Sequence, residues 1–188
     1  MKALIFVATL VVLAFPGVGA SQSSGIPLED VVGAIDIQLS REQLLSAGVS
    51  DDGVELRALA ADSSNSRYVR SRSVSLLGFF PCEENASFVS DIARNDADPE
   101  IRATAIYLAA QSEMFSEGDL QELFSELGSD APEAVQIAMI RTAGRREPQI
   151  REALISPLRT ERLELTPLVT EELDMVLNGA QEVGGEYR

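Results

Sequence analysis

One helix-turn-helix pattern recurs along most of this chain, about every 32 to 34 residues between Val54 and Leu177. Its clearest copies begin at Val69-Arg70, Ile101-Arg102 and Val135-Gln136, and each opens an amphipathic stretch typical of a helix. A unit of this size cannot bury its own apolar face, so neighbouring units must stack and share one core. The repeat therefore predicts an all-α architecture.

Helix-start signals fall into two interleaved series, which predicts helix pairs. One series begins near residues 67, 99 and 132, and the other begins near residues 84, 117 and 148. The signals are N-cap residues and a proline at the first helical position, as at Ser66, Asp98-Pro99 and Ser116. In the fourth pair we expect Pro157 to break the helix, and we expect a last helix at 167–178 to cap the carboxyl end.

Residues 1–20 form a separate segment. Lys2 is followed by an apolar run from Ala3 to Ala14 and by small residues that end at Ala20. A positive start, a short apolar run and small residues before the cut are typical of a secretory signal peptide. A retained membrane anchor is the alternative, but a spanning helix needs about 20 apolar residues, and Pro16 interrupts this run. We therefore expect residues 1–20 to be removed on export.

Two further segments flank the repeats. We assign residues 21–49 to a linker and N-terminal cap, residues 50–178 to the repeat domain, and residues 179–188 to a flexible C-terminal tail. The stretch from Ile26 to Leu39 is ambiguous, because its alternating apolar residues fit a short strand or an extended cap. Ser40 and Gln43 match a capping box that starts a short helix.

The segment Asp98-Pro99-Glu100-Ile101-Arg102-Ala103-Thr104-Ala105 resembles the start of the second helix in short HEAT-like repeats. The resemblance covers roughly Val54 to Ile155 and is weaker in the other copies, where Pro is missing or shifted and Gln136 replaces Arg. Tetratricopeptide and ankyrin repeats fit worse, since the chain has no Trp and no His. The resemblance implies a right-handed α-solenoid of about four stacked HEAT-like helix pairs, a fold that commonly presents a surface to a partner.

A rotation of about 100° per residue places one apolar arc on each second helix. The arc contains the sets Ser73/Ala105/Met139, Val74/Ile106/Ile140, Leu76/Leu108/Thr142 and Leu77/Ala109/Ala143. Arg70 and Arg102 fall inside this arc, so each must find carboxylate or carbonyl partners. The resemblance implies a structural ladder in which this Arg pairs with a turn Asp of a neighbouring repeat, and Asp98 occupies that position. An anion-binding site at these arginines is the alternative.

Three lanes lie opposite the arc: Ser71/Ala103/Ile137, Ser75/Tyr107/Arg141 and Phe79/Gln111/Arg145. In HEAT-like families the second helices line the concave face, so the resemblance implies that a partner binds these lanes. Aromatic and Arg side chains contribute most of the energy of protein interfaces. An ordinary solvated surface is the alternative. The candidate partner-binding residues are Ser75, Phe79, Tyr107, Gln111, Arg141 and Arg145.

Composition excludes most catalytic chemistry. The chain has no His and one Cys, and its only Lys lies in the predicted signal peptide. Ser-His-Asp, Cys-His, Schiff-base and most zinc chemistry therefore lack their parts. The turn at 95–100 fails the calcium-loop pattern, because Pro99 and Glu100 occupy positions that need an oxygen ligand and a glycine. We expect no enzymatic activity, no cofactor and no metal.

The net charge of −15 becomes more negative when Lys2 is removed. Such a field repels nucleic acid and anionic membranes, so neither is expected as a partner, and membrane insertion is not expected after signal cleavage. Solubility or adaptation to salty surroundings explains the acidity. Cys82 has no second cysteine to pair with in the chain, so it is either a small buried side chain or the site of an intermolecular disulfide.

These features predict an exported, periplasmic or extracellular, bacterial protein. Its expected role is that of a non-enzymatic HEAT-like repeat scaffold or accessory subunit that binds another protein through its concave helix face. One alternative is a structural cell-envelope component without a saturable partner. The other is a HEAT-like lyase that attaches chromophores to antenna proteins, a resemblance that reaches only the repeat itself.

Overall fold

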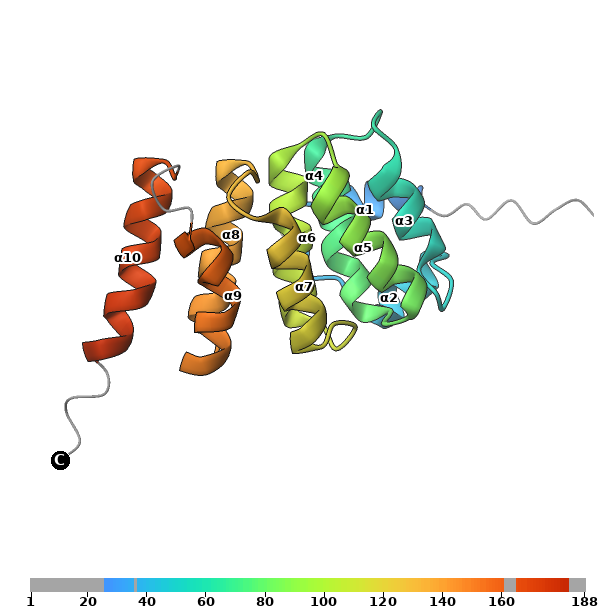
Figure 1. Ribbon diagram of the computed structural model, residues 1–188. Coiled ribbons are helices and arrows are strands. Elements are labelled where there is room, and N and C mark those ends of the chain that lie inside the picture. Colours follow the sequence, from blue (N-terminus) through green and yellow to red (C-terminus); the bar gives the residue numbers. More distant parts are fainter. Residues whose placement is uncertain (1–25, 36, 161–164, 183–188) are drawn as a thin grey trace, which may run out of the picture.

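The computed structural model describes residues 26–35, 37–160 and 165–182, and within these ranges the chain is helical and has no strands (Figure 1). The predicted all-α class is confirmed for this part of the chain. The predicted signal peptide lies outside the described residues. None of the described helices is long and apolar enough to cross a membrane. The helices are α1 Leu28–Gly33, α2 Arg41–Ser46, α3 Val54–Ala61, α4 Arg67–Leu76, the 3-10 helix η1 Leu77–Phe79, α5 Glu83–Asn95, α6 Pro99–Gln111, α7 Glu117–Leu127, α8 Glu133–Gly144, α9 Pro148–Thr160 and α10 Pro167–Glu182.

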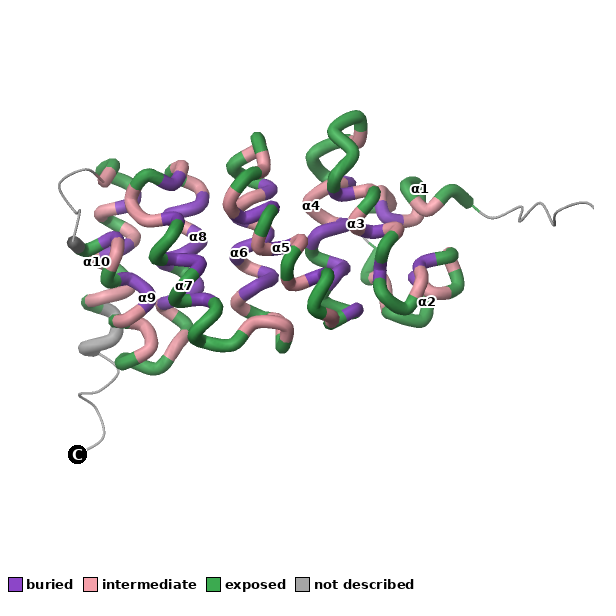
Figure 2. The backbone as a smooth tube through the Cα atoms, turned by 45° about the vertical axis from the view of Figure 1, so that its right-hand side comes forward, coloured by how far each residue is buried: buried purple, intermediate pink, exposed green. Residues whose placement is uncertain are grey.

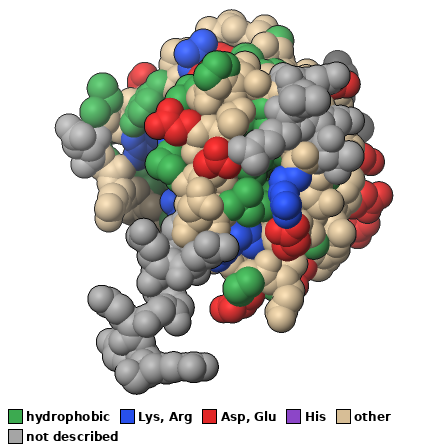
Figure 3. Space-filling model, turned by 60° about the vertical axis from the view of Figure 1, so that its left-hand side comes forward, with side chains coloured by type: hydrophobic (Ala, Val, Ile, Leu, Met, Phe, Trp, Pro, Cys, Tyr) green, Lys and Arg blue, Asp and Glu red, His purple; other side chains and the backbone are tan. Residues whose placement is uncertain are grey.

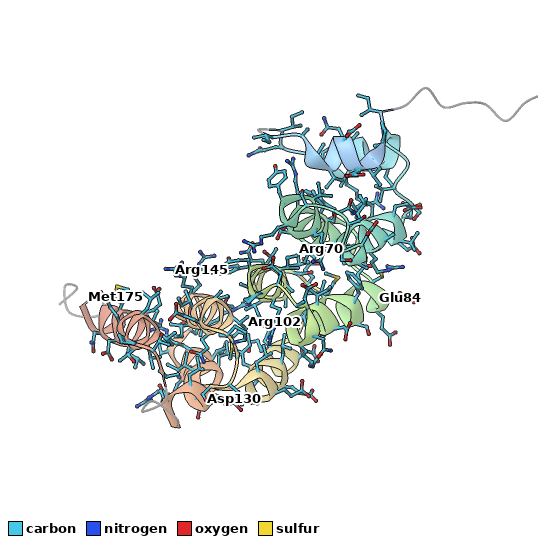
Figure 4. All side chains as sticks on the ribbon, turned by 90° about the horizontal axis from the view of Figure 1, so that it is seen from above. Arg70, Glu84, Arg102, Asp130, Arg145 and Met175 are labelled. Carbon is cyan, nitrogen blue, oxygen red and sulfur yellow. The ribbon has the colours of Figure 1, made fainter. Side chains whose placement is uncertain are left out.

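From α3 onward the helices form two rows. In the inner row α4 packs against α6, α6 against α8, and α8 against α10. The outer row contains α3, α5, α7 and α9, of which α3 packs against α4, α5 against α6, and α9 against both α8 and α7. Seen from above, the rows bend, with the inner row on the inside of the bend and the outer row on the outside (Figure 4).

Local capping explains why the helices begin where the sequence predicts. The side chain of Ser66 accepts a hydrogen bond from a backbone N–H of the first turn of α4, and Asp98 does the same for α6. Ser40 and Ser116 form capping boxes at the starts of α2 and α7. Each cap satisfies N–H groups that a helix leaves unpaired at its start, which contributes about 1 kcal/mol per helix.

One hydrophobic core runs between the two rows, and buried residues follow their facing sides (Figure 2). The three reference positions of the repeat, Val69, Ile101 and Val135, are 7%, 0% and 0% exposed. All residues of the four predicted sets are buried as well, whereas Arg70 and Arg102 are half-buried, and α10 adds Val169 and Leu173 to the core. A large apolar side chain contributes about 1.5–3 kcal/mol when it is fully buried. Because the helix pairs share these residues, each pair depends on its neighbours.

The predicted solvent-facing lane Ser71/Ala103/Ile137 is wrong in the middle of the inner row. Ala103 is buried and Ile137 is half-buried, because α6 and α8 each have an inner-row neighbour on both sides. A helix in such a position is apolar around more of its circumference than a helix with one partner. The neighbours also approach closely: a Cβ added to Gly144 of α8 would lie 3.0 Å from Cγ2 of Val176 of α10.

The N-terminal cap is more helical than the sequence suggests. Part of the ambiguous stretch forms the short helix α1, which buries Val32 and packs against α4. The strand alternative is therefore wrong for Leu28–Gly33.

The predictions at the C-terminal end need two corrections. Helix α9 continues through Pro157 instead of ending before it, and the residues around it include the buried Leu154, Ile155 and Leu158. Packing of these side chains offsets the cost of a proline inside a helix, which is about 3 kcal/mol. Helix α10 runs on to Glu182, so the predicted tail at 179–188 is wrong for its first residues, and the rest lies outside the described part.

Candidate binding surface

The six candidate partner-binding residues lie on three successive inner-row segments: α4 with η1, then α6, then α8. Ser75, Phe79, Gln111, Arg141 and Arg145 are exposed, and Tyr107 is half-buried. Arg145 points to the inner side of the bend, as does Met175 of α10, whereas Glu84 lies on the outer side (Figure 4). The repeat period places the six side chains on the side of Arg145, and this side of the inner row is called here the inner face.

Arg141 is not free on this surface, because α10 holds it. Its Nε and Nη2 donate to Oε1 and Oε2 of Glu172, both at 3.0 Å. The hydrogen bonds from Arg141 to Glu172, then the charge of Glu172 and a hydrogen bond with Tyr107, raise the pKa of Arg141 above its ordinary value. A forked Arg–carboxylate pair has a fixed orientation. Tyr107, Arg141 and Glu172 therefore link α6, α8 and α10 across the inner face.

A small pocket lies between the C-terminal turns of α6 and α8, next to this network. It has a volume of about 170 Å³ and is lined by Ala110, Gln111, Thr142, Arg145 and Arg146. No carboxylate is among these lining residues. The pocket joins two candidate residues, Gln111 and Arg145, to a second guanidinium that the sequence analysis did not select.

One rung of the predicted ladder is present, at Arg70, but its partner is not Asp98, and Arg102 has no ion pair in the described residues. Arg70 forms its ion pair with Asp96, two residues earlier in the same turn, and the side chains are only 14% and 5% exposed. Asp98 instead caps α6 and pairs with the exposed Arg67. Burial raises the pKa of Asp98, but hydrogen bonds from Arg67 and from the backbone, with the charge of Arg67, lower it below its ordinary value overall.

Arg70 and Arg102 also donate hydrogen bonds to carbonyl oxygens near the C-terminal ends of the outer helices. Nε of Arg70 donates to the carbonyl oxygen of Ala60 in α3 at 2.8 Å, and Nε of Arg102 donates to Ala93 of α5 at 2.9 Å. Gln136 takes the same place in the next repeat, where its Nε2 donates to the carbonyl oxygen of Ser129. Helix C-termini leave carbonyl groups unpaired, and Arg70 and Arg102 each satisfy one of them, while Gln136 bonds a carbonyl just past the end of α7. This explains how Gln can replace Arg in the third copy.

Sequence reasoning missed the contribution of α10 to the surface. Leu168 and Met175 are 50% and 55% exposed, and the face that α10 turns outward mixes hydrophobic and acidic side chains (Figure 3). Met175 lies one repeat period after Arg141, so extending the lane Ser75/Tyr107/Arg141 by one more helix would have found it.

A second apolar region lies at the N-terminal end. A cavity of about 740 Å³ between α1 and α2 is lined mainly by apolar residues, among them the exposed Ile26 and Ile37. It is separate from the inner-face pocket, since the two share no lining residue.

Cys82 is half-buried just before α5 and has a free thiol among the described residues. The intermolecular disulfide stays a prediction. The described residues hold no group of three side chains suited to bind a metal ion.

Comparisons with protein-family models, with curated proteins and with solved structures find no match to this chain.

Proposed function

We propose that this chain is an exported, non-enzymatic scaffold, built as a right-handed α-solenoid of HEAT-like helix pairs, that binds a protein partner through its inner face. The observation that carries the proposal is that the helices of the inner row have two different sides. The buried sides of α4, α6 and α8 form the shared core, while the opposite sides present Phe79, Tyr107 and Arg145. Aromatic and Arg side chains on a preformed surface are typical of protein-binding sites.

Rigidity supports this role. The ladder fixes the ends of the outer helices, and the pair of Arg141 with Glu172 ties α8 to α10. A surface held in this way loses little conformational entropy on binding, so weak individual contacts can add up to a useful affinity. The pattern of residues 1–20 supports the export part of the proposal, with the periplasm or the cell exterior as the destination.

Two matched serine variants test the inner face. Ser75 of α4 and Ser125 of α7 are both exposed, and each hydroxyl donates to the carbonyl oxygen four residues earlier, at 3.1 and 2.8 Å. Ser75→Arg therefore adds a large charged side chain to the inner face, and Ser125→Arg adds the same group to the outer row. Partners captured from envelope extracts by the wild type are purified, and their Kd for all three proteins is measured by calorimetry.

We expect Ser75→Arg to weaken a true partner at least about tenfold and Ser125→Arg to leave its Kd unchanged. Equal binding by both variants would mean that the partner binds a surface other than the inner face. Recovery of no saturable partner would favour a structural role in the cell envelope. A tetrapyrrole absorption band that stays with the protein after free pigment is removed by gel filtration would favour the chromophore lyase.

A further inference from the structure

The negative charge of this molecule is unevenly divided between its two rows. Helix α7 alone carries Glu117, Asp119, Glu122 and Glu126, and α5 begins with Glu83-Glu84. In the inner row α4 contains no acidic residue, and α6 and α8 contain one each, Glu100 and Glu133, whereas α10 at the end of the row carries Glu171, Glu172 and Asp174. The inner row is therefore poor in carboxylates along α4, α6 and α8, and becomes acidic only at α10.

The pocket between α6 and α8 presents side-chain donors, and several of the backbone acceptors around it are already used. The carbonyl oxygen of Ala110 accepts from Nη2 of Arg146. The carbonyl oxygens of Thr142 and Ala143 accept from the backbone N–H groups of Arg145 and Arg146, at 3.3 and 2.9 Å. What stays available is the guanidinium of Arg145, the side-chain amide of Gln111, the hydroxyl of Thr142 and the outer edge of Arg146.

Arg145 has no carboxylate partner within the described part of the chain, and neither has Arg146, whose Nη2 donates to a backbone carbonyl. Arg141, one turn earlier, is held by Glu172, and Arg70 is held by Asp96. A guanidinium fork matches the two oxygens of a carboxylate, and the bond is charge-assisted. The pocket's volume of about 170 Å³ has room for the end of one acidic side chain, since a single water occupies about 30 Å³ of liquid volume.

We propose that the inner face binds an acidic segment of its protein partner, and that one carboxylate of this segment enters the pocket and pairs with Arg145 and Gln111. This rests on the proposed function and names the chemistry of the partner. Charge complementarity indicates the class of partner: around the pocket, α6 and α8 offer the guanidinium of Arg145 and no lining carboxylate, so an acidic segment fits there better than a basic one.

The pocket is tested first without any partner. Sodium propionate, which mimics the end of an acidic side chain, is titrated into the ¹⁵N-labelled mature chain, and the Nε–Hε signal of Arg145 and the amide signals of Gln111 are followed. Propionamide serves as the uncharged isostere and inorganic phosphate as the tetrahedral anion. Arg145→Gln removes the fork, and Arg159→Gln in α9, whose arginine pairs with Glu152, is the matched control.

We expect saturable shifts confined to the pocket with propionate, at least about tenfold weaker binding for Arg145→Gln, and wild-type binding for Arg159→Gln. Equal shifts with propionamide, tighter binding of phosphate, or no saturable shift would each overturn the carboxylate pocket. Backbone spectra of each variant that superimpose on the wild type away from the pocket show that the fold is kept.

The second part of the test measures how well the wild type and the variants capture purified partner proteins. Weaker capture by Arg145→Gln supports the acidic segment, and capture that Arg145→Gln leaves unchanged overturns it. If propionate binds but no protein is captured, a free carboxylate is the ligand and the proposed function fails. If Ser75→Arg abolishes capture while propionate does not bind, the proposed function stands and the acidic-segment proposal fails.

Discussion

The ion pair between Arg70 and Asp96 allows a sharp test of what holds the repeats together. Asp96→Ala leaves the guanidinium of Arg70 in a site where its side chain is only 14% exposed. Removing one partner of a buried pair costs about 3–5 kcal/mol, because the other charge stays buried without compensation. Arg70 keeps its bond to the carbonyl oxygen of Ala60, so we expect a loss near the lower limit, about 3 kcal/mol.

The exposed pair in the same turn provides the comparison. Arg67 is 64% exposed where it meets Asp98, so Arg67→Ala should cost at most about 1 kcal/mol. Urea unfolding followed by far-ultraviolet circular dichroism measures both losses. With a slope of about 2 kcal/mol per M, Asp96→Ala shifts the midpoint by roughly 1.5 M and Arg67→Ala by less than about 0.5 M.

The double variant Arg70→Met with Asp96→Leu distinguishes two costs: that of a buried charge without a partner and that of lost side-chain packing. We expect it to recover most of the stability that Asp96→Ala loses, since apolar side chains of similar size often replace a buried ion pair without net cost. The reasoning is refuted if Asp96→Ala shifts the midpoint no more than Arg67→Ala, or if the double variant is the least stable of the three.

Further predictions concern the stability of variants at Thr142 and Pro157, the loss of stability in acid, and the salt dependence of propionate binding. Thr142→Val should raise the free energy of unfolding by about 1 kcal/mol, since the buried hydroxyl has no hydrogen-bond partner; calorimetry showing an unchanged or lower Tm would contradict this. Pro157→Ala should stabilise α9 by about 1–3 kcal/mol in urea unfolding, because it restores a backbone donor inside the helix. Hydrogen bonds from the hydroxyl and backbone of Ser116, which outweigh burial, lower the pKa of Asp119. Its contribution is therefore complete above about pH 4 and lost as the pH falls through the depressed pKa, so Asp119→Asn should flatten that part of an acid titration of stability. Lowering the salt from about 0.15 to about 0.01 M should weaken propionate binding to the pocket, which the same NMR titration measures.

The helix order is predictable from sequence because its causes are local. A capping serine or aspartate and the apolar residues of one helix lie within a few positions of each other, so each helix start is encoded where it occurs. The partner of Arg70 is different. Asp96 and Asp98 are both acidic residues of one turn, and only the path of the backbone decides which of them caps α6 and which faces the neighbouring arginine.

Prediction of the inner face is limited in the same way, because part of it depends on how whole helices pack against each other. Helical periodicity identified Phe79, Gln111 and Arg145 as exposed, since it needs only the helix itself. It misplaced Ala103, because burial on a second side depends on a neighbouring helix pair. It also gave no sign that Glu172 holds Arg141, a contact that depends on how α10 docks on α8.

The acidic-segment proposal must still be consistent with a molecule of charge −15. Helices in contact lie about 8–10 Å apart, and at physiological salt a charge is screened over about 8 Å, so the carboxylates of the outer row act weakly at the inner face. A carboxylate in contact with Arg145 lies well inside this length, so the local attraction exceeds the attenuated repulsion. At about 0.01 M salt the screening length grows to about 30 Å, and the whole outer row then repels the incoming anion. If Arg145 alone governed the pocket, propionate would bind more tightly at low salt. Because binding here depends on screening of the outer-row carboxylates, we expect propionate to bind less tightly at low salt.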